Sequence, residues 1–253
     1  MASELLSVQE ATVAFDGFTV LDRLTLTVMR GELRFLIGPN GAGKTTLLDM
    51  LTGKVRPSSG KILYEGDTDI TRREEHELVR LGIGRKFQTP AVYASLSVFE
   101  NLEVALGFRH RLPSLFGKLS SVEHDRIEIT LKKVGLLDRT RVNAGFLSHG
   151  EQQWLEIGML LVQDPKLVLL DEPVAGMTGQ EREKTGDLLH SLEERHTVVV
   201  TEHDMDFVRR FSRTVTVLHM GRVIKEGTMD EVQHDPQVVD VYLGRRAVAG
   251  VTA

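Results

Sequence analysis

The spacing of apolar residues divides the first part of the chain into predicted strands and helices. Residues 5–36 alternate apolar and polar side chains with the period of two expected for half-buried strands. The apolar segment 32–37 runs directly into a glycine-rich loop, and helical spacing follows over 45–51. Residues 60–70 predict a further strand. Turn and cap residues separate these segments, at Asp16-Gly17, Arg30-Gly31, Gly53 and Gly66-Asp67.

The pattern changes between about residues 89 and 146, where strand signals are scarce. Ser97 and Glu100 have the spacing of a capping box before the apolar run VFENLEVAL, and a second helix is predicted over 121–134. A loop separates the two helices and contains Arg109, His110, Arg111 and Pro113. We therefore expect a helical subdomain, residues 89–162, inserted into a core made of residues 1–88 and 163–253.

Beyond residue 146 strands and helices alternate. The predicted elements are a helix over 151–162, a strand over 167–170, a helix over 180–195 and a strand over 197–201. The segment VTVLHMGRVIKEG then predicts a hairpin that turns at Met220-Gly221, before a short helix and a frayed end, 246–253. Because alternating strands and helices are typical of a parallel sheet, the predicted fold class is α/β.

Composition narrows the class of protein. A chain of 253 residues with 41% apolar and 26% charged residues is long enough for one large soluble domain. A net charge of −5 does not support a general nucleic-acid binder, and the absence of cysteine excludes disulfides and thiolate metal sites. No apolar run approaches the roughly 18–20 residues of a membrane span, and the N-terminus lacks the pattern of a signal peptide. Work at a membrane would therefore proceed from the cytoplasmic side through partners.

The glycine-rich loop has the pattern G-x-x-x-x-G-K-[ST] of a phosphate-binding P-loop. Its glycines let backbone N–H groups approach phosphate oxygens, and the helix that follows adds its positive dipole end. Lys44 is expected to bridge the β- and γ-phosphates, and the Thr45 hydroxyl to bind Mg²⁺. The structural alternative is a plain glycine turn, which the flanking strand and helix disfavour. The expected nucleotide ligands here are Gly38, Pro39, Asn40, Gly41, Ala42, Gly43, Lys44, Thr45 and Thr46.

Two carboxylates follow the apolar strand LVLL. Asp171 is expected to reach Mg²⁺, directly or through water, and Glu172 to polarise the attacking water. The alternative is a solvated Asp-Glu turn that closes the strand. His203 follows the next strand and is expected to contact the γ-phosphate and to hold the water and Glu172 in line, although a single histidine is more often a surface or core residue.

Two further residues and one turn become candidates through their order in the chain. Gln88 is expected to contact Mg²⁺ or the water and to sense a partner, and Phe15 to stack on adenine, unless it is an ordinary strand aromatic. The turn LSHGE precedes an amphipathic helix and supplies a second phosphate-facing element through Ser148, Gly150 and Glu151. Two such turns and one carboxylate pair suggest that nucleotide is held between two copies of the fold.

In this order the residues resemble an ATP-binding cassette (ABC) ATPase over nearly the whole chain, and LSHGE resembles the family signature LSGGQ. The resemblance implies a P-loop ABC core with a mixed or parallel sheet flanked by helices, an N-terminal antiparallel β part and an inserted helical subdomain. It also implies ATP with Mg²⁺ as ligands. Two subunits would pair head to tail, so that Ser148 and Gly150 of one face the γ-phosphate bound by the other. The helical subdomain would contact integral-membrane permease subunits at the cytoplasmic face of the inner membrane.

Three stretches resemble the ATPase subunits of branched-chain amino acid and urea importers, namely GIGRKFQTPAVYASLSVFENLEVAL, DEPVAGMT and GTMDEVQHDPQVVDVYLG. The combination of RKFQTP, LSHGEQQWLEIGMLL and EPVAGM is most similar to the urea type, with branched-chain amino acids as the alternative solute. Such relatives pair with a second ATPase subunit, as a heterodimer or homodimer, and receive solute indirectly from a solute-binding protein.

The departures from the family pattern are His149 for a glycine, Glu151 for a glutamine, Trp154 where a basic residue is common, and 174–177 without the usual acidic residue. His149 offers either a donor to phosphate or a tolerated outward-facing side chain. Glu151 suits the helix dipole, and it opposes a triphosphate if it faces inward.

Two other classes of protein remain as alternatives to a transport ATPase. A non-transport ABC ATPase that acts on nucleic acid or ribosomes typically carries fused cassettes, coiled coils or zinc modules, which this sequence lacks. A P-loop kinase or GTPase is disfavoured by the signature turn and by the absence of an N-K-x-D motif. We therefore expect an importer ATPase that binds no nucleic acid.

Overall fold

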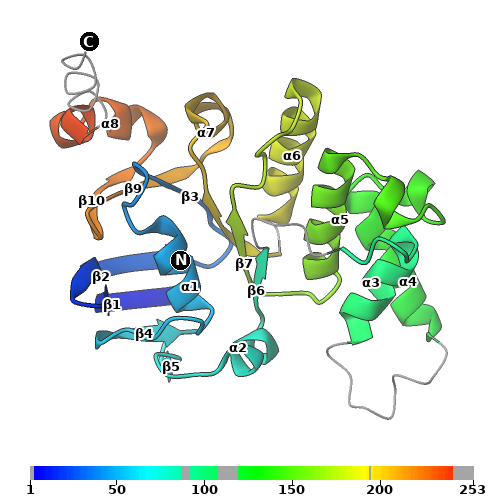
Figure 1. Ribbon diagram of the computed structural model, residues 1–253, viewed down its shortest axis with the longest axis horizontal. Helices are drawn as coiled ribbons and strands as arrows, with labels where there is room; N and C mark the ends of the chain where they lie inside the picture. The colour runs from blue at the N-terminus through cyan, green and yellow to red at the C-terminus, as the bar shows by residue number, and fades with distance from the viewer. Residues whose placement is uncertain (1–2, 87–91, 108–118, 194, 242–253) are drawn as a thin grey trace.

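The computed structural model describes residues 3–86, 92–107, 119–193 and 195–241, and Figure 1 shows how its elements are arranged. The strands are β1 (Glu4–Phe15), β2 (Phe18–Met29), β3 (Leu33–Ile37), β4 (Ser59–Tyr64), β5 (Thr68–Asp69), β6 (Ile83–Lys86), β7 (Leu167–Asp171), β8 (Thr197–Thr201), β9 (Thr214–His219) and β10 (Arg222–Gly227). The α-helices are α1 (Lys44–Leu51), α2 (Glu75–Leu81), α3 (Val98–Gly107), α4 (Ser121–Lys133), α5 (His149–Leu161), α6 (Gly179–Leu192), α7 (Met205–Phe211) and α8 (Met229–Gln233).

The strands form two sheets. The first is antiparallel, in the order β2-β1-β4-β5. The second has the order β10-β9-β3-β8-β7-β6, in which β6, β7, β8, β3 and β9 are parallel and only the edge strand β10 is antiparallel. The fold is thus a mixed sheet with helices and an N-terminal antiparallel part, which confirms the predicted α/β ABC-type fold.

The central strands are buried on both faces, because helices and the small sheet cover them. In β7, Val168 and Leu170 belong to one apolar cluster with α5 and α6, whereas Leu167 and Leu169 belong to another with α1 and the antiparallel sheet. Continuous apolar runs of this kind are typical of parallel strands covered on both sides. The carboxyl ends of these parallel strands lie at one edge of the sheet, where the polar residues that follow them gather.

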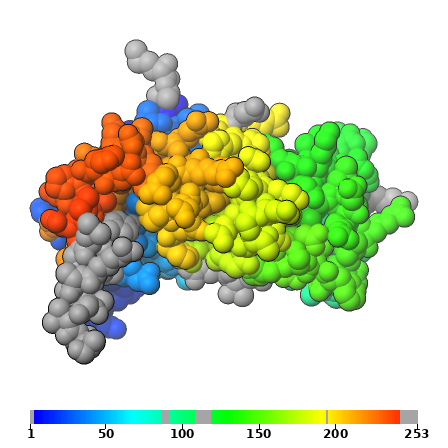
Figure 2. Space-filling model, turned by 90° about the horizontal axis from the view of Figure 1, so that it is seen from above, coloured from blue at the N-terminus to red at the C-terminus, as the bar shows by residue number. Residues whose placement is uncertain are grey.

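Helices α3, α4 and α5 lie together at one end of the molecule, shown in green in Figures 1 and 2. Capping boxes begin α4 and α5, and the predicted box between Ser97 and Glu100 begins α3, with Ser97 N donating to Glu100 Oε2 at 2.7 Å. The division into residues 1–88 with 163–253, and 89–162, stays our proposal for the domain organisation. Within the described ranges, no helix has both the length and the apolar character needed to cross a membrane.

The periodicity identified most elements, and α5 begins two residues earlier than predicted because Ser148 is its N-cap. The hairpin at Met220-Gly221 forms as expected, with φ of 48° and 74° at the two turn residues. The pattern did not reveal α2, β6 or α7. Strand β6 reads IGRK, and its two charges hide a strand whose Arg85 and Lys86 are nevertheless buried. The predicted features at Gln88, in the loop of Arg109 and at 246–253 lie outside the described residues.

Candidate active site

The glycine-rich loop connects the buried strand β3 to helix α1. Lys44 Nζ donates to the carbonyl oxygens of Gly38 and Pro39, at 2.7 and 3.2 Å, and so draws the loop around its own ammonium group. Two glycines are required by close approach. A Cβ at Gly38 would lie 2.2 Å from the Leu218 carbonyl oxygen, and one at Gly43 would lie 2.7 Å from the Leu21 side chain.

The start of α1 carries no side-chain acceptor of its own. Its N-cap is Gly43, which makes no side-chain hydrogen bond to the first turn, and that turn contains no acidic residue. The other α-helices described over 75–233 carry a side-chain acceptor at or next to their start. The first N–H groups of α1 therefore have no side-chain acceptor, and the dipole of a helix favours a negative ligand at such a position. Burial lowers the pKa of Lys44, while the nearby carboxylates of Glu172 and Asp171 act in the opposite direction.

Asp171 ends β7 and is 2% exposed. It is held from both neighbouring strands, since Thr201 Oγ1 of β8 donates to Oδ1 at 2.5 Å and Arg85 Nη2 of β6 lies 3.2 Å from Oδ2. Arg85 also pairs with Asp49 of α1 at 2.5 Å. The guanidinium thus connects the carboxylate to the helix that follows the phosphate loop. Sequence reasoning missed Arg85, because nothing near it in the chain indicates its two carboxylate partners.

Glu172 leaves the strand through a left-handed conformation, with φ of 48°, and its backbone N donates to the Thr201 carbonyl at 3.0 Å. This turn directs the side chain out of the sheet, where it is 30% exposed. His203, two residues beyond the end of the adjacent strand β8, places Nδ1 3.5 Å from Glu172 Oε1. The structure therefore brings together the two residues that the sequence placed after neighbouring strands.

Glu202, between β8 and His203, is a buried carboxylate that sequence reasoning missed. It is 1% exposed and accepts hydrogen bonds from the backbone N of Val174 at 3.3 Å and of His203 at 3.2 Å. Burial raises the pKa of Glu202 to about 7, although these backbone bonds and that of Asp204 lower it. Glu202 thus joins the loop after Glu172 to the backbone that carries His203.

Phe15 ends β1, and its cross-strand partner in the hairpin is Phe18, the first residue of β2. Both rings reach solvent, with 46% and 78% exposed. Strand β2 passes beside the phosphate loop, because a Cβ at Gly43 would lie 3.1 Å from the Val20 carbonyl oxygen. The hairpin that carries Phe15 therefore continues into the strand beside the loop, and it exposes a second aromatic residue, Phe18, that the sequence analysis did not name.

The LSHGE turn forms the start of α5. Ser148 is the N-cap, its hydroxyl accepting from Glu151 N at 3.2 Å, while Glu151 Oε2 accepts from Ser148 N at 2.9 Å. Glu151 also pairs with Arg139 at 3.2 Å. The carboxylate of Glu151 therefore faces the start of its own helix, where it suits the helix dipole. Gly150 is buried, and a Cβ there would lie 2.3 Å from Glu181 Oε1, so the signature turn packs closely on α6.

His149 is exposed, yet it does not point freely into solvent. Its Nε2 lies 3.1 Å from the carbonyl oxygen of Ala175, in the loop that follows Glu172. Trp154 donates from Nε1 to Thr185 of α6 at 2.9 Å, so this departure from the family pattern packs against a neighbouring helix. Figure 1 shows α5 well apart from α1, so the signature turn and the phosphate loop of one chain do not surround the same point.

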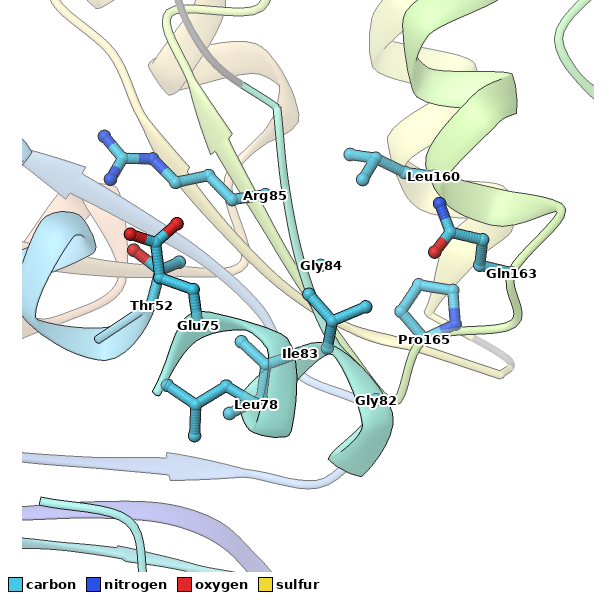
Figure 3. Close-up of a pocket in the computed structure, with 11 residues that line it drawn as sticks. Thr52, Glu75, Leu78, Gly82, Ile83, Gly84, Arg85, Leu160, Gln163 and Pro165 are labelled. Atoms are coloured by element: carbon cyan, nitrogen blue, oxygen red, sulfur yellow. The ribbon is translucent and has the colours of Figure 1, made fainter. Parts of the chain in front are cut away.

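A separate hollow of about 140 Å³ lies where α2, the edge strand β6 and the end of α5 meet (Figure 3). Leu78, Ile83, Leu160 and Pro165 supply apolar walls, and Gln163 and Arg85 add polar groups.

No group of three or more potential metal-binding side chains occurs within the described ranges. A Mg²⁺ site beside the glycine-rich loop and the end of β7 would thus depend on few protein oxygens and on the phosphates of a nucleotide, as is usual for this ion.

The chain is similar in sequence to known ATP-binding proteins over almost its whole length. The family model described as ABC transporter matches residues 21–175, and one described as branched-chain amino acid ATP-binding cassette transporter matches residues 222–248. The high-affinity branched-chain amino acid transport ATP-binding protein LivG of Escherichia coli K12 is 33% identical, over 96% of this chain and 99% of its own length. A probable LivG of Archaeoglobus fulgidus is 34% identical over 95% of this chain and 96% of its own length.

Solved structures show the same fold. The ADP conformation of MJ1267, an ATP-binding cassette of an ABC transporter, aligns with a TM-score of 0.83 at 32% identity, over 95% of this chain and 99% of that one. The dimeric cassette MJ0796 aligns with a TM-score of 0.76 at 27% identity, over 89% and 99% of the two chains.

Proposed function

Because the chain belongs to the ATP-binding cassette (ABC) transporter family, we propose that it powers the import of branched-chain amino acids. It is an ABC ATPase whose hydrolysis of ATP is coupled to transport. One observation supports this choice of solute. The family model that matches residues 222–248 and the relatives that align with almost the whole chain are both described as branched-chain amino acid transport proteins.

The phosphate loop and the strand ends support the roles proposed for ATP hydrolysis. Lys44 and the free N–H groups of α1 bind the phosphates, and Phe15 stacks on adenine. Glu172 polarises the attacking water, and His203, 3.5 Å away, holds that carboxylate in line. Thr45, Asp171 and Gln88 would hold Mg²⁺, which when bound neutralises charge on the phosphates.

The separation of α5 from α1 supports a head-to-tail dimer. In this arrangement Ser148 and Gly150 of one subunit contact the nucleotide bound to the phosphate loop of the other, and Glu151 keeps the helix start in shape through its capping box. ABC cassettes dimerise, as the dimeric MJ0796 illustrates. We propose a second, different ATPase subunit as the partner in the cell, with a homodimer as the alternative.

The helical part is the proposed contact with the permease. The hollow beside α2, β6 and α5 lies where this part joins the core, next to the strand that leads to Gln88. A permease segment that docks there would act on the core and on α5 together. The protein would then work at the cytoplasmic face of the inner membrane, and a solute-binding protein would act on it only through the permease.

Urea is the second candidate solute. It rests on the segments RKFQTP, LSHGEQQWLEIGMLL and EPVAGM, which resemble urea-importer ATPases. Lys86 of the first segment pairs with Glu156 of the second at 3.3 Å, and His149 of the second contacts Ala175 of the third. Where the structure describes these segments, the residues that carry the urea resemblance are therefore connected by direct contacts.

Uptake assays decide between the solutes. A strain that lacks this gene is tested with radiolabelled leucine and with radiolabelled urea, and each defect is complemented with the wild-type gene or with Glu172→Gln. Loss of leucine uptake that only the wild-type gene restores is the expected result. Loss of urea uptake with intact leucine uptake would refute the branched-chain proposal and support the second candidate.

A further inference from the structure

The loop 174–177, between Glu172 and α6, is held from two sides. On the side of the sheet, Val174 N donates to the buried carboxylate of Glu202 at 3.3 Å, and Ala175 N donates to the Glu172 carbonyl at 3.2 Å. On the side of α5, the carbonyl oxygen of Ala175 lies 3.1 Å from His149 Nε2 and 3.4 Å from Gln153 Nε2. The loop is therefore a physical connection between the start of α5 and the carboxylate Glu172.

The hydrogen bonds from α5 to this loop hold in either tautomer of the histidine. His149 Nε2 and Gln153 Nε2 are 3.1 Å apart, one helical turn from each other on α5. With the ring proton on Nδ1, the Gln153 amide donates one hydrogen to the ring and the other to Ala175. With the proton on Nε2, the ring itself donates to Ala175. In both cases the Ala175 carbonyl is bonded to α5.

The ring also packs against the next residue of the loop. A Cβ at Gly176, where φ is 73°, would lie 3.2 Å from His149 Nε2, so the loop backbone and the ring are in close contact. Because His149 itself is exposed, this contact does not fill the core, and its removal would leave no internal cavity. A glycine at position 149, as in the usual LSGGQ signature, has no side chain that could reach Ala175.

We propose that His149 is a positioning residue that transmits movement of the signature turn to Glu172 of the same subunit. The inference rests on the proposed arrangement in which Ser148 and Gly150 contact the nucleotide of the partner. When that nucleotide shifts the start of α5, the link from His149 through Ala175 shifts the loop that follows Glu172. Each subunit thereby adjusts its own catalytic carboxylate to the occupancy of the other site.

Hydrogen exchange of the full chain without nucleotide tests the link directly. Both Ala175 N and Met177 N are hydrogen-bonded within the loop, so their exchange reports its opening. In His149→Gly the two amides should exchange about three- to tenfold faster, the effect of one lost hydrogen bond, either from the ring to Ala175 or from the Gln153 amide to the ring that orients it toward Ala175. His149→Gln keeps a donor at a similar reach and should restore slow exchange. The matched control is His76→Ala, which removes an exposed histidine from α2.

Steady-state hydrolysis tests the consequence. His149→Gly should lower kcat about three- to tenfold with KM for ATP unchanged, and His149→Gln should recover most of kcat. Unchanged exchange at Ala175 and Met177, or faster exchange with unchanged kcat, would overturn the proposal. Faster exchange throughout α5 with a lower Tm would also overturn it, because it would show a structural role. A wild-type chain without ATPase activity would contradict the proposed function instead, and the exchange comparison would still decide whether the link exists.

Discussion

Replacing Glu202 by glutamine is expected to change how the stability of the protein depends on pH. Glu202 is 1% exposed, and its two oxygens accept backbone hydrogen bonds from Val174 and His203. Burial raises its pKa from the ordinary value of 4.5 to about 7. Glutamine has nearly the same shape but does not titrate, so the substitution isolates the contribution of this one proton.

The sign follows from proton binding. The folded protein binds a proton at Glu202 more tightly than the unfolded chain does, so the free energy of unfolding falls as pH rises from about 4.5 to 7. The stabilising contribution is complete below pH 4.5 and is lost once the pH passes about 7. The difference between the two pKa values corresponds to about 3 kcal/mol. The free energy of unfolding of Glu202→Gln minus that of the wild type should therefore rise by about this amount across the interval.

Urea unfolding at pH 5 and pH 8, followed by the fluorescence of Trp154, the single tryptophan, measures this difference. Glu128→Gln is the control, because it makes the same change from carboxylate to amide at a side chain that is 55% exposed, and so shows the effect of the substitution outside a buried site. Parallel stability curves for Glu202→Gln and the wild type would refute the reasoning, since they would mean that Glu202 titrates alike in the folded and unfolded states.

Three further substitutions test the site. Glu172→Gln should lower kcat by about a hundredfold or more while a fluorescent ATP analogue still binds, and hydrolysis at the wild-type rate would contradict its role. Lys44→Ala should abolish binding of that analogue without a fall in Tm beyond a few degrees, because Lys44 is only partly buried; retained binding would contradict the phosphate site. Arg85→Leu leaves Asp171 buried without its cation and should destabilise the fold by about 3–5 kcal/mol, seen in thermal unfolding. An unchanged Tm would show that Asp49 and Asp171 need no partner.

Local chemistry explains which parts of the site were predictable. The phosphate loop and the turn LSHGE are contiguous, and each glycine or cap residue acts on backbone within a few positions, so their shapes follow from neighbouring residues. Asp171 ends a buried strand, Glu172 and His203 come just after such strands, and the parallel sheet brings the ends of these strands together. Arg85 escaped this reasoning because its partners, Asp49 and Asp171, are distant in the chain.

The sequence by itself determined the α/β class, the phosphate loop, the order of the catalytic candidates and the family resemblance, because these depend on periodicity and on residues close together in the chain. Only the tertiary structure decided the direction of the two side chains that differ from the LSGGQ signature, His149 and Glu151. Glu151 turns to its own helix start, and His149 reaches the carbonyl of Ala175, 26 positions away. The direction of a surface side chain depends on which backbone folds against it, and that is a property of packed elements rather than of the motif in which the residue stands.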